Sequence, residues 1–404
     1  MTAVHGVNDR HAELLALTRR ALAHHRAGTT DQAEATMAIP VAAYADPARH
    51  AREVDRIFRH LPIALALSIE LPAPGDWRAM HVLDVPVLIV RGDDGLVRAF
   101  LNVCRHRGAR LCEPGSGHAR ALRCPYHSWV YDTRGALTRR YGAESFGEVD
   151  HATHGLTALA CAERAGLVYV LLTPGETFDI DDWLGDFAAE LGTLQLDRWT
   201  LHAQRELPGP GWKMTMDGYL EAYHHDSLHG RTVGVHTIGN LLVLDTWGPH
   251  QRLTFGRKTL ASLVDLPEAE WDAAAHIRLI HNCFPNLSVS GILGDHCLVS
   301  QVFPGPTPRT TLTRQSVLVA SPPVTDAARE ATEAFSAMTL QAVRDEDYAT
   351  VSTIHDGLQS GANAVFLLGR NELAVQNYHR AVAYFMSAGQ AEELSSDGAG
   401  CRPA

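Results

Sequence analysis

Two mixed pairs of cysteine and histidine have the clearest potential for chemistry in this chain. Cys104 and His106 are separated by one residue and Cys124 and His127 by two, with 17 residues between the pairs. Thiolates and imidazoles are ligands that zinc and iron–sulfur clusters take from proteins. If each pair stands on a tight loop, the four side chains can converge on one metal centre.

The order of the ligands distinguishes between the two kinds of centre. A zinc site with two cysteines and two histidines usually pairs like with like along the chain. A [2Fe-2S] cluster of the Rieske type instead takes two thiolates on one iron and two imidazoles on the other. The mixed order favours the cluster, and we predict that Cys104, His106, Cys124 and His127 bind it. Zinc remains the alternative, and Cys112 fits no ligand position.

A second candidate metal site lies further along the chain. His224 and His229 are five residues apart, which on an undistorted helix places them about 140° from each other. We therefore expect the helix that begins near Gly211 to end or deform between them. Two imidazoles and one carboxylate form the facial triad of non-haem Fe(II) oxygenases. The spacing alone is weak, because a chain with 23 histidines also contains ordinary core and surface pairs.

Acidic residues beside the first of these histidines strengthen the metal interpretation. Asp217, Glu221 and His224 stand at positions i, i+4 and i+7, which share one face of a helix. A metal-bound imidazole usually donates its second ring N–H to a carboxylate or a carbonyl group. We expect the two acidic residues to orient His224.

The two sites together resemble those of the Rieske non-haem iron oxygenases, the family of aromatic-ring-hydroxylating dioxygenase alpha subunits. The resemblance extends from about Tyr44 to about Met386, and it includes the order of the cluster segment, the iron histidines and a late carboxylate. It implies that Asp347 is the third ligand of a mononuclear Fe(II), with Asp345 and Glu346 as rivals.

The same resemblance assigns a role to Glu221. In the family, a carboxylate at this position links a Rieske histidine of one subunit, here His127, to an iron histidine of the neighbouring subunit. Many ring-hydroxylating members have Asp there, so Glu221 favours members that act on other substrates. Ser128 is a further departure, because the family commonly has glycine at this position.

The resemblance also implies an activity and its partners. Electrons from NAD(P)H arrive through a separate flavin and iron–sulfur reductase or a ferredoxin, and no glycine-rich nucleotide fingerprint follows a strand in this chain. The implied reaction hydroxylates or dihydroxylates an aromatic substrate with O2. The alternatives are oxidative N- or O-demethylation or C–N cleavage of a quaternary amine and, in a different class, an electron carrier that uses only the cluster. A homotrimer, with or without a β subunit, is implied as well.

The elements that must position these residues predict an α+β protein. It combines a mostly-β Rieske domain with a helix-grip catalytic domain, in which helices cover an antiparallel sheet. Alternating apolar residues predict strands at 82–90 and 166–172, with a hairpin turn at 92–95. Long helices are predicted at 325–358 and 372–388.

Four segments follow from this pattern. Residues 1–39 form an N-terminal helix that packs on the catalytic domain, and residues 40–175 form the Rieske domain. The catalytic iron domain spans 176–394, and the tail 395–404, rich in glycine and serine, is expected to be disordered.

Composition excludes several classes of function. A formal charge of −11 over 404 residues argues against binding to nucleic acid or to an anionic membrane. Charges interrupt the N-terminal helix, unlike a signal peptide, and the apolar stretches are too short to span a bilayer. Seven cysteines are too few for a disulfide scaffold and favour the reducing cytoplasm.

Other polar and aromatic residues of the second half could line a substrate pocket. Ordinary core or surface positions explain each of them at least as well. They are His225, Asp226, His236, Asn240, His281, Asn282, His296, Tyr219, Phe255 and Phe284.

Overall fold

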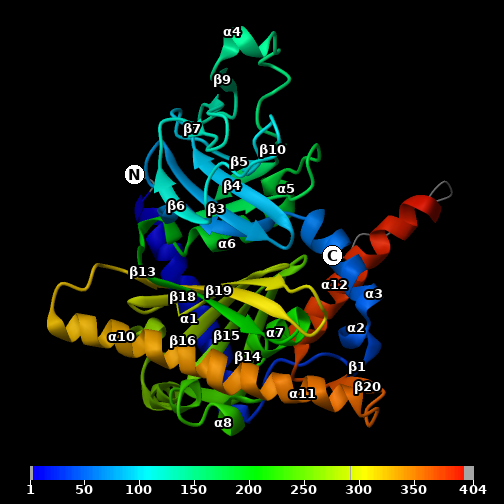
Figure 1. Cartoon of the computed structure of the whole chain (residues 1–404). Helices are drawn as coiled ribbons and strands as arrows, with labels where there is room; N and C mark the ends of the chain where they lie inside the picture. The colour runs from blue at the N-terminus through cyan, green and yellow to red at the C-terminus, as the bar shows by residue number, and fades with distance from the viewer. Residues whose placement is uncertain (1–2, 292, 395–404) are drawn as a thin grey trace. The chain divides into compact units, whose positions relative to one another are not determined.

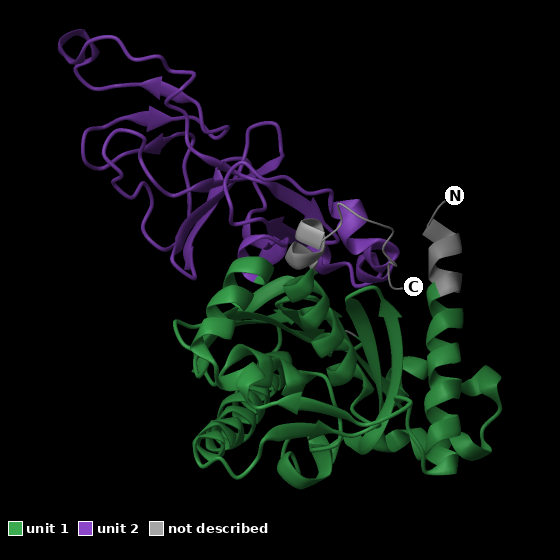
Figure 2. Cartoon of the chain, turned by 90° about the vertical axis from the view of Figure 1, so that its right-hand side faces the viewer, with its two compact units in different colours: residues 1–57, 199–404 green, residues 58–198 purple. Residues whose placement is uncertain are grey.

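The computed structural model describes residues 3–291 and 293–394, so the predicted disordered tail at 395–404 lies outside the described residues. The chain divides into two compact units, drawn in different colours in Figure 2. Unit 1 contains residues 1–57 and 199–404, and unit 2 contains residues 58–198.

Unit 2 consists mainly of short antiparallel strands in three sheets. A five-stranded sheet has the order β10-β5-β4-β3-β6, and two three-stranded sheets have the orders β11-β12-β2 and β7-β8-β9. Of its three short helices, α4 (Ala143–Phe146) lies between the ninth and tenth strands of the chain, and α5 (Ile180–Leu184) and α6 (Phe187–Gly192) follow the last strand of the unit. The strands are β2 (Ile63–Leu67), β3 (Asp76–Val82), β4 (Val85–Arg91), β5 (Val97–Leu101), β6 (Gly115–His118), β7 (Leu122–Arg123), β8 (Val130–Tyr131), β9 (Leu137–Arg139), β10 (Ala158–Leu159), β11 (Cys161–Arg164) and β12 (Leu167–Val170).

The structure corrects one predicted strand of unit 2. The predicted strand 82–90 is divided, because the chain turns at Leu83, whose φ of 58° is left-handed, and Val82 pairs with Val85 across that turn. The next hairpin turn, at 92–95, forms as predicted. There Gly95 has a φ of 78°, which glycine adopts without steric cost.

Unit 1 is built around a seven-stranded antiparallel sheet with the order β13-β19-β18-β17-β16-β15-β14. Its strands are β13 (Thr200–Gly209), β14 (Thr237–Trp247), β15 (His250–Arg257), β16 (Ile277–Cys283), β17 (Leu287–Ser290), β18 (His296–Pro304) and β19 (Thr311–Val319). A separate strand pair joins β1 (Met37–Pro40) to β20 (Val365–Leu368). Sheets of antiparallel strands with separate helices make this an α+β protein, as predicted.

Helices cover this sheet (Figure 1). The predicted helix 325–358 forms as a continuous run, in which eight residues are wound as a π-helix between two α-helices. The first helix of the chain contacts β14 and β15. The helices are α1 (Ala3–Ala27), α2 (Ala42–Ala45), α3 (Pro47–Glu53), α7 (Trp212–Tyr219), α8 (His225–Leu228), α9 (Ala273–His276), α10 (Asp326–Leu340), the π-helix η7 (Gln341–Tyr348), α11 (Ala349–Gln359) and α12 (Leu373–Leu394).

The compact units have different limits from the predicted domains 40–175 and 176–394. Residues 42–53 belong to unit 1 because helix α3 contacts α12 there. At the other end, unit 2 extends to residue 198, because a turn at 196–198 packs against the turn at 68–70 of the same unit. None of the helices in the described part of the chain is both long and apolar enough to cross a bilayer.

Candidate metal centres and substrate cavity

Two loops of unit 2 present the cysteine and histidine pairs, and their backbones are closed in the same way. The N–H of Cys104 donates to the carbonyl of residue 109, and the N–H of Gly108 donates to the carbonyl of Cys104. The N–H of Cys124 likewise donates to the carbonyl of residue 129, and that of Ser128 to the carbonyl of Cys124. Both loops therefore turn with the same hydrogen-bonded geometry.

The fourth residue after each cysteine has a left-handed backbone. Gly108 has a φ of 78° and Ser128 a φ of 55°. Glycine is the residue that adopts this conformation without cost, so Ser128 is a non-glycine residue at a glycine-type position. Its hydroxyl accepts a hydrogen bond from Arg123 at 3.0 Å, which anchors the side chain.

The loops bring the four predicted cluster residues together. Cys104 and Cys124 are both buried in one hydrophobic cluster of unit 2. The rings of His106 and His127 lie 4.7 Å apart, and Trp129 stacks on His106 at 5.0 Å with an angle of 6° between the rings. The buried Nδ1 of His106 has no hydrogen-bond partner among the described residues. A nitrogen of that kind is suited to a metal ligand.

The surroundings of the two thiols are also compatible with a bound cluster. Burial raises the pKa of the Cys104 thiol, and the neighbouring Cys124 adds to this rise. Cysteine thiols become thiolates when a metal centre binds to them. The hydroxyl of Tyr131, 3.4 Å from the sulfur of Cys104, also receives the N–H of Arg105. The donor set and its surroundings therefore fit a [2Fe-2S] cluster of the Rieske type.

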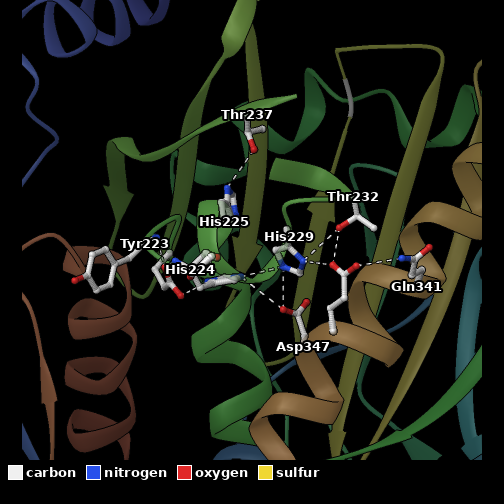
Figure 3. Close-up of polar contacts among 11 residues, drawn as sticks. Tyr223, His224, His225, His229, Thr232, Thr237, Gln341 and Asp347 are labelled. Atoms are coloured by element: carbon white, nitrogen blue, oxygen red, sulfur yellow. Dashed lines mark hydrogen bonds and ion pairs between the residues drawn. The ribbon is translucent and has the colours of Figure 1, made fainter. Parts of the chain in front are cut away.

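In unit 1, three side chains converge on one point (Figure 3). The Nε2 atoms of His224 and His229 lie 3.1 Å apart. Asp347 Oδ1 lies 3.6 Å from the first of them and 3.0 Å from the second. One ligand atom from each residue lies within 4.8 Å of the others. Two nitrogens and one carboxylate oxygen in this arrangement match a facial triad.

The helix that carries the histidines is shorter than predicted. Helix α7 ends at Tyr219, so Glu221 and His224 do not share a helix face with Asp217. His224 and His229 instead flank the single turn of α8. The helix from Gly211 therefore ends before both histidines and not between them as predicted, and His229 follows the end of the single turn of α8.

Glu221 nevertheless reaches His224 by a local turn. Its carboxylate accepts hydrogen bonds from the backbone N–H groups of Tyr223 and His224, and it contacts the Nδ1 of His224. Asp217 does not orient His224 as expected. It accepts hydrogen bonds from Tyr44 Oη at 2.7 Å and contacts His379 Nε2 at 2.9 Å.

The π-helix η7 supplies two adjacent carboxylates to His229. Asp347 faces Nε2, and Glu346 Oε2 lies 2.6 Å from Nδ1. Thr232 donates to the same oxygen of Glu346 at 2.6 Å, and Gln341 donates to the other oxygen at 3.2 Å. π-helical segments are rare and are often found at functional sites.

The three candidate carboxylates on η7 therefore have different positions. Asp347 lies at the convergence point, Glu346 lies behind His229, and Asp345 is 48% exposed and ion-paired with Arg344. Both Glu221 and Glu346 contact Nδ1 atoms, which leaves the Nε2 lone pairs of the two histidines directed at the centre.

The electrostatics of the centre favour a positive charge. Burial alone would lower the pKa of His229, but Asp347 and Glu346 raise it. Burial would likewise raise the pKa of Glu346, but hydrogen bonds from His229 and Thr232 lower it. A site that holds two carboxylates next to a buried imidazole stabilises a proton or a metal cation at Nε2.

A cavity of about 390 Å³ opens beside this triad. Five of the predicted pocket residues line it, namely His225, His236, His296, Tyr219 and Phe255. Burial lowers the pKa of His225 to about 3, and its Nδ1 lies 3.3 Å from the hydroxyl of Thr237. The cavity lining does not include Asp226, Asn240, His281, Asn282 and Phe284.

Two arginines line the same cavity and were not predicted. They are Arg257 at the end of β15 and Arg278 on β16. The sequence signal that could have identified Arg257 is the alternation of side-chain direction along a strand. Arg257 and Phe255 are two residues apart in one strand, so their side chains share a face.

Comparison with known proteins identifies both parts of the chain. Residues 62–146 match the model of the Rieske [2Fe-2S] domain, and residues 196–388 match that of the ring hydroxylating alpha subunit (catalytic domain). The predicted combination of a mostly-β Rieske domain with an α+β catalytic domain is therefore confirmed.

Individual relatives match about half of the chain. The chain is 33% identical over 213 residues to the glycine betaine monooxygenase oxygenase subunit of Chromohalobacter salexigens, covering 52% of this chain and 47% of that protein. It is 32% identical over 214 residues to the chlorobenzene dioxygenase subunit alpha of Cupriavidus sp., covering 51% and 45%. The chain thus spans about half the length of the curated relatives it matches.

A solved structure extends the likeness in fold. The quaternary ammonium Rieske monooxygenase CntA, in complex with its substrate L-carnitine, has a TM-score of 0.73 to this chain at 23% sequence identity. The match covers 86% of this chain and 95% of that chain. It shows that the two chains share a fold.

Proposed function

Because this chain belongs to the family of Rieske non-haem iron oxygenase alpha subunits, we propose that it is the terminal component of an oxygenase system. The observation that carries the proposal is the convergence of His224, His229 and Asp347 beside a cavity. In this family the Rieske domain takes a [2Fe-2S] cluster and the catalytic domain a mononuclear iron, the two cofactors that we predicted. When bound, these groups supply electron transfer and the activation of O2.

The residues have distinct roles in this proposal. Cys104, Cys124, His106 and His127 hold the cluster. His224, His229 and Asp347 hold the iron, and Glu221 links His224 to the cluster histidine His127 of a neighbouring subunit. The last assignment rests on the family resemblance and on the contact between Glu221 and the Nδ1 of His224.

The surrounding groups of the chain keep the iron site in one arrangement. Glu221 and Glu346 hold the Nδ1 side of each imidazole, which fixes the tautomer and the ring orientation. Apolar side chains, among them Phe255, Leu298 and Phe335, line the cavity beside the triad. A substrate in this cavity would lie next to the proposed iron. A protein that only carries electrons through a cluster would not need such a cavity.

We propose hydroxylation or dihydroxylation of an aromatic substrate as the first candidate reaction. The aromatic and aliphatic cavity wall supports it, as does the family model of the catalytic domain. The second candidate is oxidation of a quaternary amine with loss of an N-substituent. It is supported by the relative named for glycine betaine and by Glu221, which stands where many ring-hydroxylating members have Asp.

The partners of the system follow from the same proposal. Electrons come from NAD(P)H through a separate reductase or ferredoxin, and the active assembly is a homotrimer, with or without β subunits. We place it in the reducing cytoplasm because the chain has few cysteines.

Product analysis tests the function and distinguishes the two reactions. The purified protein is combined with a compatible reductase, NADH, isotopically labelled O2 and a panel of aromatic acids, aromatic hydrocarbons and quaternary amines. Two labelled oxygens on a ring indicate dioxygenation, one indicates monooxygenation, and aldehyde release indicates N-dealkylation. Absence of any labelled product or aldehyde, with iron and cluster both present, would refute the proposal.

A further inference from the structure

One face of the sheet in unit 1 forms the floor of the cavity, and strand register places two arginines on it. Arg278 of β16 is paired with Phe255 of β15, and Arg257 stands two residues after Phe255. Because side chains alternate along a strand, all three project to the same side. The same register continues through Ile280 and Ser290 to Leu298, which also line the cavity.

Neither of these arginines has an acidic partner within 4.0 Å among the described residues. Arg278 uses its Nη1 to donate to the carbonyls of Ala274 and Ile277, at 3.0 and 2.8 Å. Arg257 donates through its Nη1 to the carbonyl of Ala275 at 3.4 Å. The Nε and Nη2 groups of both guanidiniums have no partner in the part of the chain that the structure describes.

Two buried arginines of unit 1 are paired with carboxylates, whereas the half-buried Arg205 has only uncharged partners. Arg314 pairs with Glu206 at 3.0 Å, and Arg252 pairs with Asp245 at 3.0 Å. The arginines of the cavity likewise lack a carboxylate partner, and burial together with the charge of Arg257 lowers the pKa of Arg278 to about 10, although the charge of Asp295 opposes this shift. An unpaired cation at a partly desolvated position costs free energy that a bound anion recovers.

Acidic groups also line the cavity, and the charge of one of them, Asp295, acts on Arg278 without forming an ion pair with it. Asp295 is 84% exposed at its side chain and contacts His296 Nδ1 at 2.7 Å. Glu221 and Asp347 belong to the iron site. The two guanidiniums thus offer free N–H groups to the cavity, and they are suited to planar carboxylates because two parallel N–H groups match two oxygens.

We propose that Arg257 and Arg278 bind a carboxylate of the substrate while the rest of the substrate lies along the apolar wall towards His224, His229 and Asp347. This inference deepens the proposed function and rests on it. It restricts the substrate to compounds that carry an anionic group, such as aromatic acids or zwitterionic betaines. Neutral aromatic hydrocarbons and quaternary amines without a carboxylate are then poor substrates.

Matched pairs of compounds test the inference. Benzoate is compared with methyl benzoate, and glycine betaine with its methyl ester, since each pair differs in the anionic group. Binding is measured by equilibrium dialysis on the protein with both metal sites loaded, and product formation is measured with reductase and labelled O2. We expect at least one carboxylate to bind on the order of 10- to 100-fold more tightly than its ester.

The variants Arg278→Gln and Arg257→Gln should lose most of this preference while binding the ester as the unaltered protein does. Lys258→Gln is the matched control, because Lys258 is the exposed cation adjacent to Arg257 and does not line the cavity. Cluster absorption and iron content verify that each variant is folded and loaded.

The outcomes separate the inference from the proposed function. Equal binding of acid and ester, or an unchanged preference in both variants, overturns the inference even where product forms. Arginine-dependent carboxylate binding without any product supports the carboxylate site and overturns the proposed reaction. Arginine-dependent binding together with oxidation of the carboxylate compound supports both.

Discussion

Removing the charge of Glu346 should perturb the proposed iron site without changing any of the three proposed ligands. The substitution Glu346→Gln keeps the size of the side chain but replaces the carboxylate that contacts His229 Nδ1 at 2.6 Å and accepts from Thr232 at 2.6 Å. Because Glu346 is only 14% exposed at its side chain, water replaces these contacts poorly. His229 therefore becomes a less basic and less firmly oriented ligand.

The expected loss of iron affinity can be estimated from other metal sites in which a group hydrogen-bonded to a ligand was removed. Loss of a carboxylate behind a metal-bound imidazole typically costs 10- to 100-fold in metal affinity. This corresponds to about 1.4–2.7 kcal/mol of binding free energy. Asp347→Asn should cost far more, because Asp347 lies 3.0 Å from His229 Nε2 at the convergence point.

Competition with a chelator measures this difference. Iron that remains in the catalytic site is quantified against chelator concentration, and the visible absorption of the cluster serves as an internal reference. Asp345→Asn is the matched control, because Asp345 is the adjacent carboxylate on the same π-helix and is 48% exposed.

We expect Asp347→Asn to retain the least iron and Asp345→Asn the most, with Glu346→Gln between them. If Glu346→Gln retained iron like Asp345→Asn, the contact with His229 would have no role in metal binding. If Glu346→Gln lost iron as completely as Asp347→Asn, Glu346 would have to be a ligand itself.

Four further outcomes are expected. Cys104→Ala should abolish the visible absorption of the cluster, and a normal spectrum would exclude Cys104 as a ligand. His224→Ala should keep that absorption but lose the mononuclear iron and all substrate oxidation; full turnover would place the iron elsewhere. Glu221→Gln should retain both metals yet slow single-turnover oxidation of a pre-reduced cluster by on the order of tenfold or more, and an unchanged rate would remove its bridging role. Lys213→Met should lower the free energy of unfolding by about 3–5 kcal/mol in denaturant titrations, because it leaves the fully buried Glu53 with a weaker set of partners; the double variant with Glu53→Gln should recover part of this loss.

The sequence alone was sufficient to predict which cysteines and histidines two loops of unit 2 bring together. Each loop spans only six residues from Cys104 or Cys124, and its hydrogen bonds close within that span. Local spacing therefore contains nearly all of the relevant geometry. The backbone at Ser128 shows the limit of this reasoning, since the sequence identified a departure from glycine but not that the position keeps a left-handed φ.

The choice among the three carboxylates of η7 was not decided by sequence. Asp345, Glu346 and Asp347 are adjacent and chemically similar, and each could approach a metal. The π-helical winding and the packing of η7 against His229, 117 residues away from Glu346, give each carboxylate a different direction. Long-range contacts of this kind have no signature in local spacing.

Tertiary structure alone also decided that two arginines share the cavity. Arg257 and Arg278 are 21 residues apart, and neither belongs to a recognisable motif. They share a cavity because β15 and β16 pair in the register that sets Arg278 opposite Phe255. A shift of that register by one residue would turn Arg278 to the other face of the sheet. The sequence determined which residues can bind metals, and strand pairing and helical winding decided which side chains surround them.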